Sequence, residues 1–318
     1  MAVMHKEKTV IQSSLPLVIG VSTRALFDLE EEHKVFCEKG VKAYAALQLE
    51  REREVLQPGV AFEVIKRLLS LNPEEGPTVV DVLLLSKNSP DLSLRAFNSA
   101  EHYGLQIRKG SFTSGRTVAP YVGAWGIDLF LSNDGLDVSA AVDAGTAAAK
   151  LGAPPMKSAE DPMDEVRIAF DGDAVVFSQE SDEIFKRDGL AAFIDHERKN
   201  AEVPLKKGPF GNFLQKLAIL RENLMRPDGS SRVRIVIVTA RNAPAHARVI
   251  HTLRAWGTPA NEAHFVGTHE KAPLLQALGA HIFFDDQVKH VLGAATVVPA
   301  GLVPGPHSPD TPIIPAID

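Results

Sequence analysis

The sequence predicts an α/β protein built on a doubly wound, mostly parallel sheet. Short apolar runs such as PLVIGVSTR and RVRIVIVTARN alternate with longer segments in which apolar residues recur at helical spacing. Uninterrupted apolar runs are typical of parallel strands that are buried on both faces. Alternating strands and helices indicate a sheet with helices on both sides.

The expected strands fall into two groups separated by a polar, proline-bearing segment. In chain order they are PLVIGVSTR, VVDVLLLSKNS and IDLFLSND, followed by VRIAFDGD, RVRIVIVTARN and AHIFFDDQ. Helical spacing predicts helices over residues 62–71 and 213–220. We therefore expect an N-terminal Rossmann-like lobe over residues 1–150, a linker over 151–166 and a second domain over 167–298.

Two further segments depart from this alternation. Between VRIAFDGD and RVRIVIVTARN lies an insert, residues 179–220, that is longer than a crossover connection requires. The last segment, residues 299–318, contains six prolines. Prolines at that spacing forbid a helix and favour an extended or disordered arm.

Composition and charge argue against several classes of protein. With 34 basic and 40 acidic residues the net charge is −6, and no basic block suggests a nucleic-acid partner. The single cysteine, Cys37, excludes an intrachain disulfide and a zinc site built from cysteines of one chain. No secretory segment or membrane-length apolar run is visible. These features predict a cytoplasmic protein with no membrane partner, and they leave a homo-oligomer open.

The two halves of the sequence match each other at two constant offsets. Phe36, Gly40 and Gly59 correspond to Phe185, Gly189 and Gly208, which lie 149 residues later. At an offset of 153 residues, FTSGRTVAPYVGAWGIDLFLSND aligns with FVGTHEKAPLLQALGAHIFFDDQ. A shared rhythm of strands and helices would not keep glycine, proline and phenylalanine in register. The matches therefore indicate an internal duplication, and they predict the same strand order in both halves.

The residues that differ between the matched halves carry the reactive groups. The second half has Asp171, Asp173, Lys271, Asp285 and Asp286. The first half has, in the same order, Ser22, Arg24, Val118, Ser132 and Asn133. A scaffold that folds without carboxylates in one copy does not need them in the other. We therefore expect chemistry in the second half only, and no magnesium site in the first.

These reactive groups follow the expected strands of the second half. Asp171 and Asp173 follow VRIAF, Thr239 ends RVRIVIVT, Asp285 and Asp286 follow HIFF, and Lys271 begins a helical segment. Taken singly, such residues are most often turn or helix-cap residues. In a parallel sheet, however, ligands gather at the carboxyl ends of the strands. Carboxylate oxygens are typical magnesium ligands, so the set predicts a Mg²⁺ site.

At this point a family resemblance is visible. AFDGDAVVFS, IVTAR, the region of Lys271 and FFDD resemble the four motifs of the haloacid dehalogenase superfamily of phosphotransferases. From Leu17 to Val298 the chain is similar to the cytosolic 5'-nucleotidase I family, through DGDAVVFSQES, LRAWG, HIFFDDQ, LRAFNSAEHYGL and LFLS. The resemblance implies a haloacid-dehalogenase-like Rossmann fold, Mg²⁺ as cofactor, and hydrolysis of nucleoside 5'-monophosphates such as AMP to nucleoside and phosphate.

The resemblance also implies catalytic roles by position. Asp171 would be the nucleophile that forms an aspartyl-phosphate, and Asp173 would act as general acid and then base. Thr239 and Lys271 would hold phosphate oxygens. Two other lysines compete for this role but do not begin a helix between the threonine and aspartate strands: Lys216 and Lys289.

The implied metal ligands come from the same strand ends. Asp285, or its neighbour Asp286, would hold magnesium together with Asp171 and the backbone carbonyl of Asp173. The resemblance leaves the choice between Asp285 and Asp286 open.

Substrate selection is less directly indicated. The insert 179–220 would form a cap over the site, as such inserts do in this superfamily. Candidate substrate-binding residues are Ser86, Lys87, Asn88, Ser114, Gly115 and Arg241. The residues of the first half would serve the substrate if the two lobes face each other across a cleft, and otherwise they form simple turns.

Two other functions stay open on the sequence alone. One is a phosphatase or phosphotransferase that acts on another small phosphate ester. The other is a nucleotide-binding regulator without turnover, against which the retained Asp171 and Asp173 argue.

Overall fold

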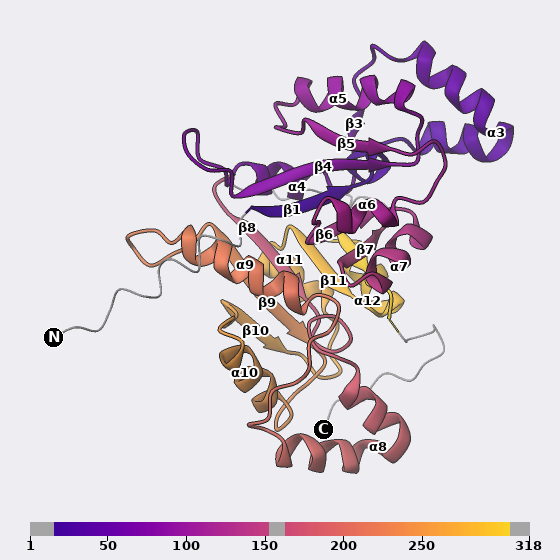
Figure 1. The fold of residues 1–318 in the computed structure, drawn as a ribbon. Coiled ribbons are helices and arrows are strands. Elements are labelled where there is room, and N and C mark those ends of the chain that lie inside the picture. The colour runs from indigo at the N-terminus through magenta and orange to yellow at the C-terminus, as the bar shows by residue number, and fades with distance from the viewer. Residues whose placement is uncertain (1–15, 153–162, 306–318) are drawn as a thin grey trace.

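The centre of the molecule is one ten-stranded sheet, seen in a computed structural model that describes residues 16–152 and 163–305 (Figure 1). The strand order is β10-β9-β8-β11-β12-β7-β6-β1-β4-β5. The strands are β1 (Leu17–Val21), β4 (Val80–Ser86), β5 (Lys109–Phe112), β6 (Leu129–Ser132), β7 (Ala147–Leu151), β8 (Val166–Phe170), β9 (Val233–Thr239), β10 (Glu262–Phe265), β11 (Ile282–Asp285) and β12 (Ala300–Leu302). A separate pair joins β2 (Phe27–Asp28) to β3 (Gln57–Pro58). The expected mostly parallel α/β sheet is confirmed.

The two halves of the sheet have the same strand order. The run β5-β4-β1-β6-β7 of the first half corresponds to β10-β9-β8-β11-β12 of the second. Corresponding strands begin 149 or 153 residues apart, as the sequence offsets predict. Ser22 and Ser132 lie on neighbouring strand ends, since the Ser22 N–H donates to the Leu131 carbonyl at 2.9 Å. Common descent of the halves stays an inference from the sequence, which this shared order supports.

The halves meet at the centre of the sheet and run in opposite directions. Within the ten-stranded sheet, all neighbouring strands pair in parallel except β7 and β12, which pair antiparallel. The carboxyl ends of the first-half strands therefore lie at the opposite edge of the sheet from those of the second half. In Figure 1 the helices that follow the first strand of each half, α3 (Glu30–Glu50) and α8 (Glu180–Lys199), lie at the top and the bottom of the molecule. The two sets of strand ends thus do not face each other across a cleft.

Helices cover both faces of the sheet. On one face lie α4 (Phe62–Leu69), α5 (Ser93–His102), α9 (Gly211–Asn223) and α10 (His246–Ala255). On the other lie α6 (Ala119–Ala124), α7 (Gly135–Asp143), α11 (Ala272–Leu278) and α12 (Val288–Ala294). Two short helical turns, α2 (Thr23–Leu26) and the 3-10 turn η2 (Pro90–Leu92), complete the described elements.

The apolar runs are buried on both faces because successive side chains of a strand point in opposite directions. In β4, Val80, Val82 and Leu84 join the core under α4 and α5, whereas Leu83 and Leu85 join the core under α6 and α7. Helix α4 also contacts β8, and α9 contacts β1. The halves therefore share one continuous core on the first of these faces.

Two segments differ from their expected form. The insert 179–220 contains α8, but its last part begins α9, whose Phe213, Leu214 and Leu217 are buried against the sheet rather than in a cap. In the expected tail 299–318, residues 300–302 form β12 at the centre of the sheet, because Ala300 and Val303 are apolar and buried between prolines. The rest of that tail from residue 306, and most of the linker (153–162), lie outside the described residues.

Candidate active site

Asp171 stands directly after β8, beside the ends of two neighbouring strands. Its N–H donates to the carbonyl of Phe284 in β11 at 2.8 Å, and its side chain is buried. Gly172 follows, and a Cβ atom there would lie 3.1 Å from Thr239 Oγ1 at the end of β9. Glycine therefore lets the chain leave β8 close to β9, and it brings Asp171 and Thr239 to one place.

Lys271 supplies the positive charge of this place. Its Nζ donates to Asp171 Oδ1 and to Asp285 Oδ2, both at 2.7 Å, and its side chain is buried. The competing lysines lie elsewhere: Lys216 pairs with Asp128 in the first half, and Lys289 is exposed. The geometry thus favours Lys271 over both alternatives.

Three carboxylates cluster at this place. Oxygen atoms of Asp171, Asp285 and Asp286 all lie within 4.8 Å of one another, and all three residues are buried. One lysine cannot neutralise three buried carboxylates, and oxygen-only donors are the preferred surroundings of Mg²⁺. The donor set therefore fits a divalent cation. The Asp173 side chain is not in this cluster, because both its oxygens accept from Arg241 at 2.7 Å.

The charges in the cluster depend on one another. Burial raises the pKa of Asp171, in spite of the attraction of Lys271. Burial acts in the same direction on Asp285, but Lys271 and His290 outweigh it and lower the pKa of that carboxyl. Burial alone would lower the pKa of Lys271, yet the two carboxylates raise it, so the amine stays charged. A further positive charge beside Asp171 would favour its ionised form.

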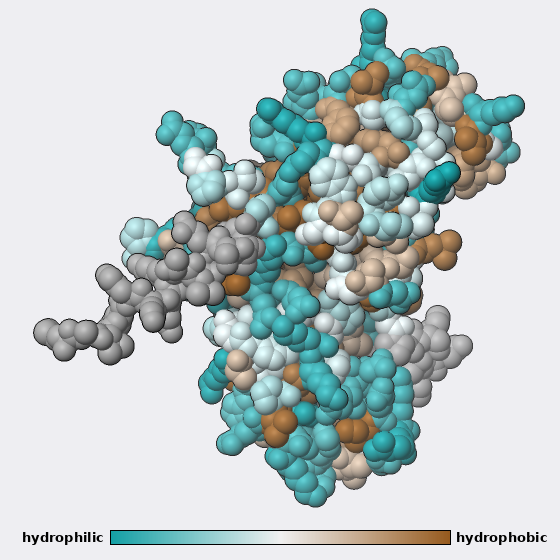
Figure 2. Space-filling view, viewed as in Figure 1, coloured by the Kyte–Doolittle hydropathy of each residue, from teal (hydrophilic) through white to brown (hydrophobic). Residues whose placement is uncertain are grey.

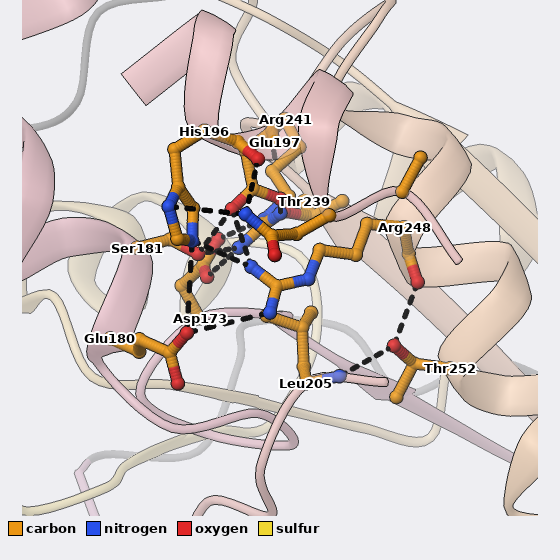
Figure 3. Close-up of polar contacts among 12 residues, drawn as sticks. Asp173, Glu180, Ser181, His196, Glu197, Leu205, Thr239, Arg241, Arg248 and Thr252 are labelled. Carbon is orange, nitrogen blue, oxygen red and sulfur yellow. Dashed lines mark hydrogen bonds and ion pairs between the residues drawn. The ribbon is translucent and has the colours of Figure 1, made fainter. Parts of the chain in front are cut away.

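Arg241 joins the acid–base candidate to helix α8 (Figure 3). Its guanidinium donates to both carboxylate oxygens of Asp173 and to Ser181 Oγ, each at 2.7 Å, and it forms an ion pair with Glu197 of α8. Burial would lower the pKa of Arg241, but Asp173 and Glu197 raise it. Arg241 is a candidate substrate residue from the sequence, and in this structure its charge is used within the protein.

A second arginine extends the network into helix α10. Arg248 Nη1 donates to Glu197 Oε1 at 2.9 Å, and its Nη2 lies 3.4 Å from Glu180 Oε1 (Figure 3). Glu197 is fully buried between the two arginines. Sequence reasoning missed Glu197 and Arg248, because they lie outside the strand-end motifs.

The other candidate substrate residues do not join the Asp171 cluster. Ser86, Lys87, Asn88, Ser114 and Gly115 lie at the carboxyl ends of the first-half strands, on the opposite edge of the sheet. They line a separate pocket there, together with Ser22 and Asn133. Their expected place beside the catalytic groups fails because β7 and β12 pair antiparallel.

Helix α7 of the first half lies beside the carboxyl ends of the second-half strands. A pocket of about 560 Å³ is lined by Ala174 and Ser178 of the segment after Asp173, and by three residues of α7: Ser139, Val142 and Asp143. Gly305 also lines it, and a Cβ atom on Gly305 would lie 3.1 Å from the Asp286 side chain. The pocket is therefore next to the carboxylate cluster. No motif marks the α7 residues, so they could not be predicted from the sequence.

Within the described ranges, no helix is both long and apolar enough to cross a membrane.

Proteins of known family that are similar to this chain bear on the function of the site. The chain is 35% identical over 295 residues to human cytosolic 5'-nucleotidase 1B, an alignment that covers 87% of this chain and 47% of that protein. The chain thus spans about half the length of this relative. Residues 9–309 match the family described as 5'-nucleotidase, and the chain belongs to that family.

Proposed function

We propose that this chain is a Mg²⁺-dependent 5'-nucleotidase that hydrolyses nucleoside 5'-monophosphates to nucleoside and phosphate. The observation that carries the proposal is the buried contact of Lys271 with both Asp171 and Asp285 at the carboxyl ends of adjacent strands. A carboxylate nucleophile, a lysine and a set of oxygen ligands are the groups that phosphoryl transfer through an aspartyl-phosphate requires. Family membership supports the same reaction class.

In the first step, an oxygen of Asp171 attacks phosphorus and the bond from phosphorus to the nucleoside oxygen breaks. Asp173, in its protonated form, gives its proton to that leaving oxygen, because an alkoxide is a poor leaving group. Lys271 and Thr239 hold phosphoryl oxygens during the transfer. In the second step, Asp173 takes a proton from water, the resulting hydroxide attacks phosphorus, and phosphate leaves as Asp171 is regenerated.

The two hydrogen bonds from Arg241 to Asp173 limit when Asp173 can donate a proton. Both Asp173 oxygens accept from Arg241 in the structure, so proton donation requires at least one of these bonds to open. Arg241 is in turn tied to α8 through Glu197 and Ser181. We assign Arg241 as a positioning residue that couples the position of α8 to the state of Asp173.

The carboxylates of Asp171, Asp285 and Asp286 would hold Mg²⁺, with the backbone carbonyl of Asp173 as a further ligand. When bound, the cation supplies charge that offsets the negative charge of the transferring phosphoryl group. We place the nucleoside in the pocket between α7 and the segment after Asp173, where Gln179 and Lys207 add polar groups. A cytosolic location, as in the name of the human relative, is part of the proposal.

Phosphate release from AMP with added Mg²⁺ tests the proposal. We expect turnover that EDTA abolishes and excess Mg²⁺ restores. A parallel set of sugar phosphates, aryl phosphates and nucleoside 3'-monophosphates defines the class. Turnover of sugar phosphates but not of 5'-monophosphates would indicate a different phosphatase, and no turnover of any ester would indicate a regulator.

A further inference from the structure

The pocket at the first-half strand ends has no role in the proposed reaction. It encloses about 520 Å³ at the edge of the sheet opposite Asp171, between α3 and the ends of β1, β4 and β6. Its position matches that of the catalytic cluster, because Ser22 follows β1 and Ser86 and Ser132 end β4 and β6, just as Asp171 follows β8 and Thr239 and Asp285 end β9 and β11. A volume of this order is typical of small-molecule sites.

Two buried polar atoms in the pocket wall lack partners. Thr23 Oγ1 and Asn133 Oδ1 are both inaccessible to water, and neither has a hydrogen-bond partner among the residues that the structure describes. Both residues line the pocket. Because neither atom is accessible from the pocket, a ligand there reaches them only when their side chains turn toward it, and it then recovers the roughly 1–3 kcal/mol that a buried polar group without a partner costs.

Aromatic side chains of α3 form the outer wall. Phe36 stacks on His33 with ring centroids 6.0 Å apart and meets the edge of Tyr44 at 5.9 Å. Phe36 is nevertheless 42% exposed, and hydrophobic residues gather on the surface around α3 and α5 (Figure 2). Gly40, whose φ is +79°, bends α3 between Phe36 and Tyr44. An exposed aromatic ring at the mouth of a pocket offers a stacking surface for a planar ligand.

The charges of the pocket are already balanced. Lys87 Nζ pairs with Asp134 at 2.8 Å and with Asp137 at 3.0 Å. Arg24 is held by Glu30 at 2.7 Å. With two cations set against three carboxylates, no positive charge is left to attract a phosphate dianion. The occupant that this wall favours is therefore uncharged.

We infer that this pocket is a non-catalytic binding site for an uncharged nucleoside. A nucleoside combines a planar heteroaromatic base, which can stack on Phe36, with hydroxyl donors for Thr23 and Asn133. The choice of nucleosides over other uncharged aromatic molecules rests on the proposed function, since the catalytic end would release one. The pocket leaves its ligand unchanged, because serine and asparagine replace the nucleophile and the carboxylate metal ligands of the other half.

Equilibrium dialysis with labelled adenosine tests the inference. The full chain with Asp171→Asn, in EDTA, prevents turnover during the measurement. We expect saturable binding that Phe36→Ala weakens by about tenfold, because stacking of a base on an aromatic ring is lost. Ala45→Trp, which fills the pocket from α3, is expected to abolish the same binding.

The internal match supplies the control. Phe185 is the counterpart of Phe36 in α8, so Phe185→Ala makes the same change at the opposite edge of the sheet and is expected to leave this binding unchanged. Absence of adenosine binding at millimolar concentration would overturn the inference, as would a binding curve that neither Phe36→Ala nor Ala45→Trp changes, since adenosine held as a product in the catalytic pocket is common to all these variants. Phe36-dependent binding of AMP at more than tenfold the affinity of adenosine would contradict the charge argument. Because AMP hydrolysis by the unmodified chain is measured separately, an empty pocket would leave the proposed function standing.

Discussion

Each half has a buried arginine in the helix that follows its second parallel strand. The polar contacts of this arginine are nearly the same in both halves. In the first half Arg95 Nε donates to the Glu54 carbonyl at 3.0 Å, and in the second half Arg248 Nε donates to the Val203 carbonyl at 2.9 Å. Four residues later, a hydroxyl donates to that arginine's own carbonyl at 2.7 Å in both halves, from Ser99 or Thr252.

At the strand ends the halves differ in charge. Asn88 of the first half accepts from the Tyr44 hydroxyl at 3.0 Å. Its counterpart Arg241 lies over the ring of Phe193, which is the counterpart of Tyr44, and pairs with Asp173 and Glu197. Gln48 stands where the second half has Glu197. The contacts that hold the helices are thus common to both halves, whereas the groups suited to phosphoryl transfer occur in one.

Removing the nucleophile gives the largest expected effect. Asp171→Asn should lower AMP turnover on the order of 10⁴-fold or more, because an amide neither attacks phosphorus well nor serves as an anionic ligand. Asp188→Asn makes the same change at an exposed carboxylate of α8 and should keep activity. Phosphate release measured with saturating Mg²⁺ checks both. Near-normal turnover of Asp171→Asn would rule out the covalent mechanism.

Loss of the acid–base group is expected to be smaller. Asp173→Asn keeps the backbone carbonyl but removes proton transfer, which is typically worth about 10²–10⁴-fold. An aryl phosphate carries a better leaving group, so the loss in its first step should be much less. Single-turnover rates of phosphoryl transfer compare the two esters. An equal loss for AMP and the aryl ester would contradict the acid role of Asp173.

Transplanting the first-half residue into the second half tests the Arg241 fork. Arg241→Asn leaves Asp173 without its partner and Glu197 with Arg248 as its remaining buried cation. Breaking a buried pair costs about 3–5 kcal/mol, so urea unfolding should show a loss of that order. Arg187→Ala, at an exposed pair with Asp188, should change stability by less than about 1 kcal/mol.

A positioning role predicts more than lost stability. If Arg241 sets the state of Asp173, the pH profile of kcat should shift in Arg241→Asn, whereas a purely structural role would lower the amount of folded enzyme at every pH. Arg241→Lys keeps the charge but not the fork, so it should restore stability in part and leave the shift. An unchanged pH profile in both variants would contradict the assignment.

The sequence predicts the strands and the meeting of Asp171, Lys271 and Asp285, because each depends on local pattern. Buried parallel strands give uninterrupted apolar runs, and the carboxylates follow those runs directly, so the meeting of Asp171 with Asp285 and Lys271 needs only the parallel order. The placement of the first-half candidates needs more. It depends on how β7 meets β12, and β12 is a three-residue strand among prolines that carries no periodic signal. The antiparallel junction sends Asn88 and Ser114 to the opposite edge from Asp171.

Ion networks between distant elements also leave little trace in a single sequence. Glu197 lies in a polar stretch of α8, where a charged residue is most often exposed, yet it is fully buried between Arg241 and Arg248. Comparing halves could have flagged it, since the match places Gln48 opposite Glu197 and Asn88 opposite Arg241. Glu197 adds a negative charge and Arg241 a positive one, so the two differences together leave the net charge unchanged.

The smallest expected effect compares the residues that hold the first strand of each half. Asp128 Oδ2 accepts from the Val18 N–H at 2.8 Å, and its counterpart His281 Nδ1 accepts from the Arg167 N–H at 2.9 Å. Burial, with Arg67 and Arg167 nearby, lowers the pKa of His281 to about 3. In the unfolded chain this histidine has its ordinary pKa of about 6.5. Below that pH the unfolded chain therefore binds a proton that the folded chain does not.

Stability should therefore fall as the pH drops below about 6.5, and the contribution of His281 should be fully present above it. Between pH 7 and pH 5 this one group should cost about 2 kcal/mol of the free energy of unfolding. His281→Asn keeps an acceptor for the Arg167 N–H but cannot be protonated, so its urea-unfolding curves should lose less stability over that range than the unmodified chain. His102→Asn, the same change at an exposed histidine of α5, controls for the loss of an imidazole as such. If His281→Asn and the unmodified chain lose the same amount of stability between pH 7 and pH 5, then protonation of His281 does not cause the loss.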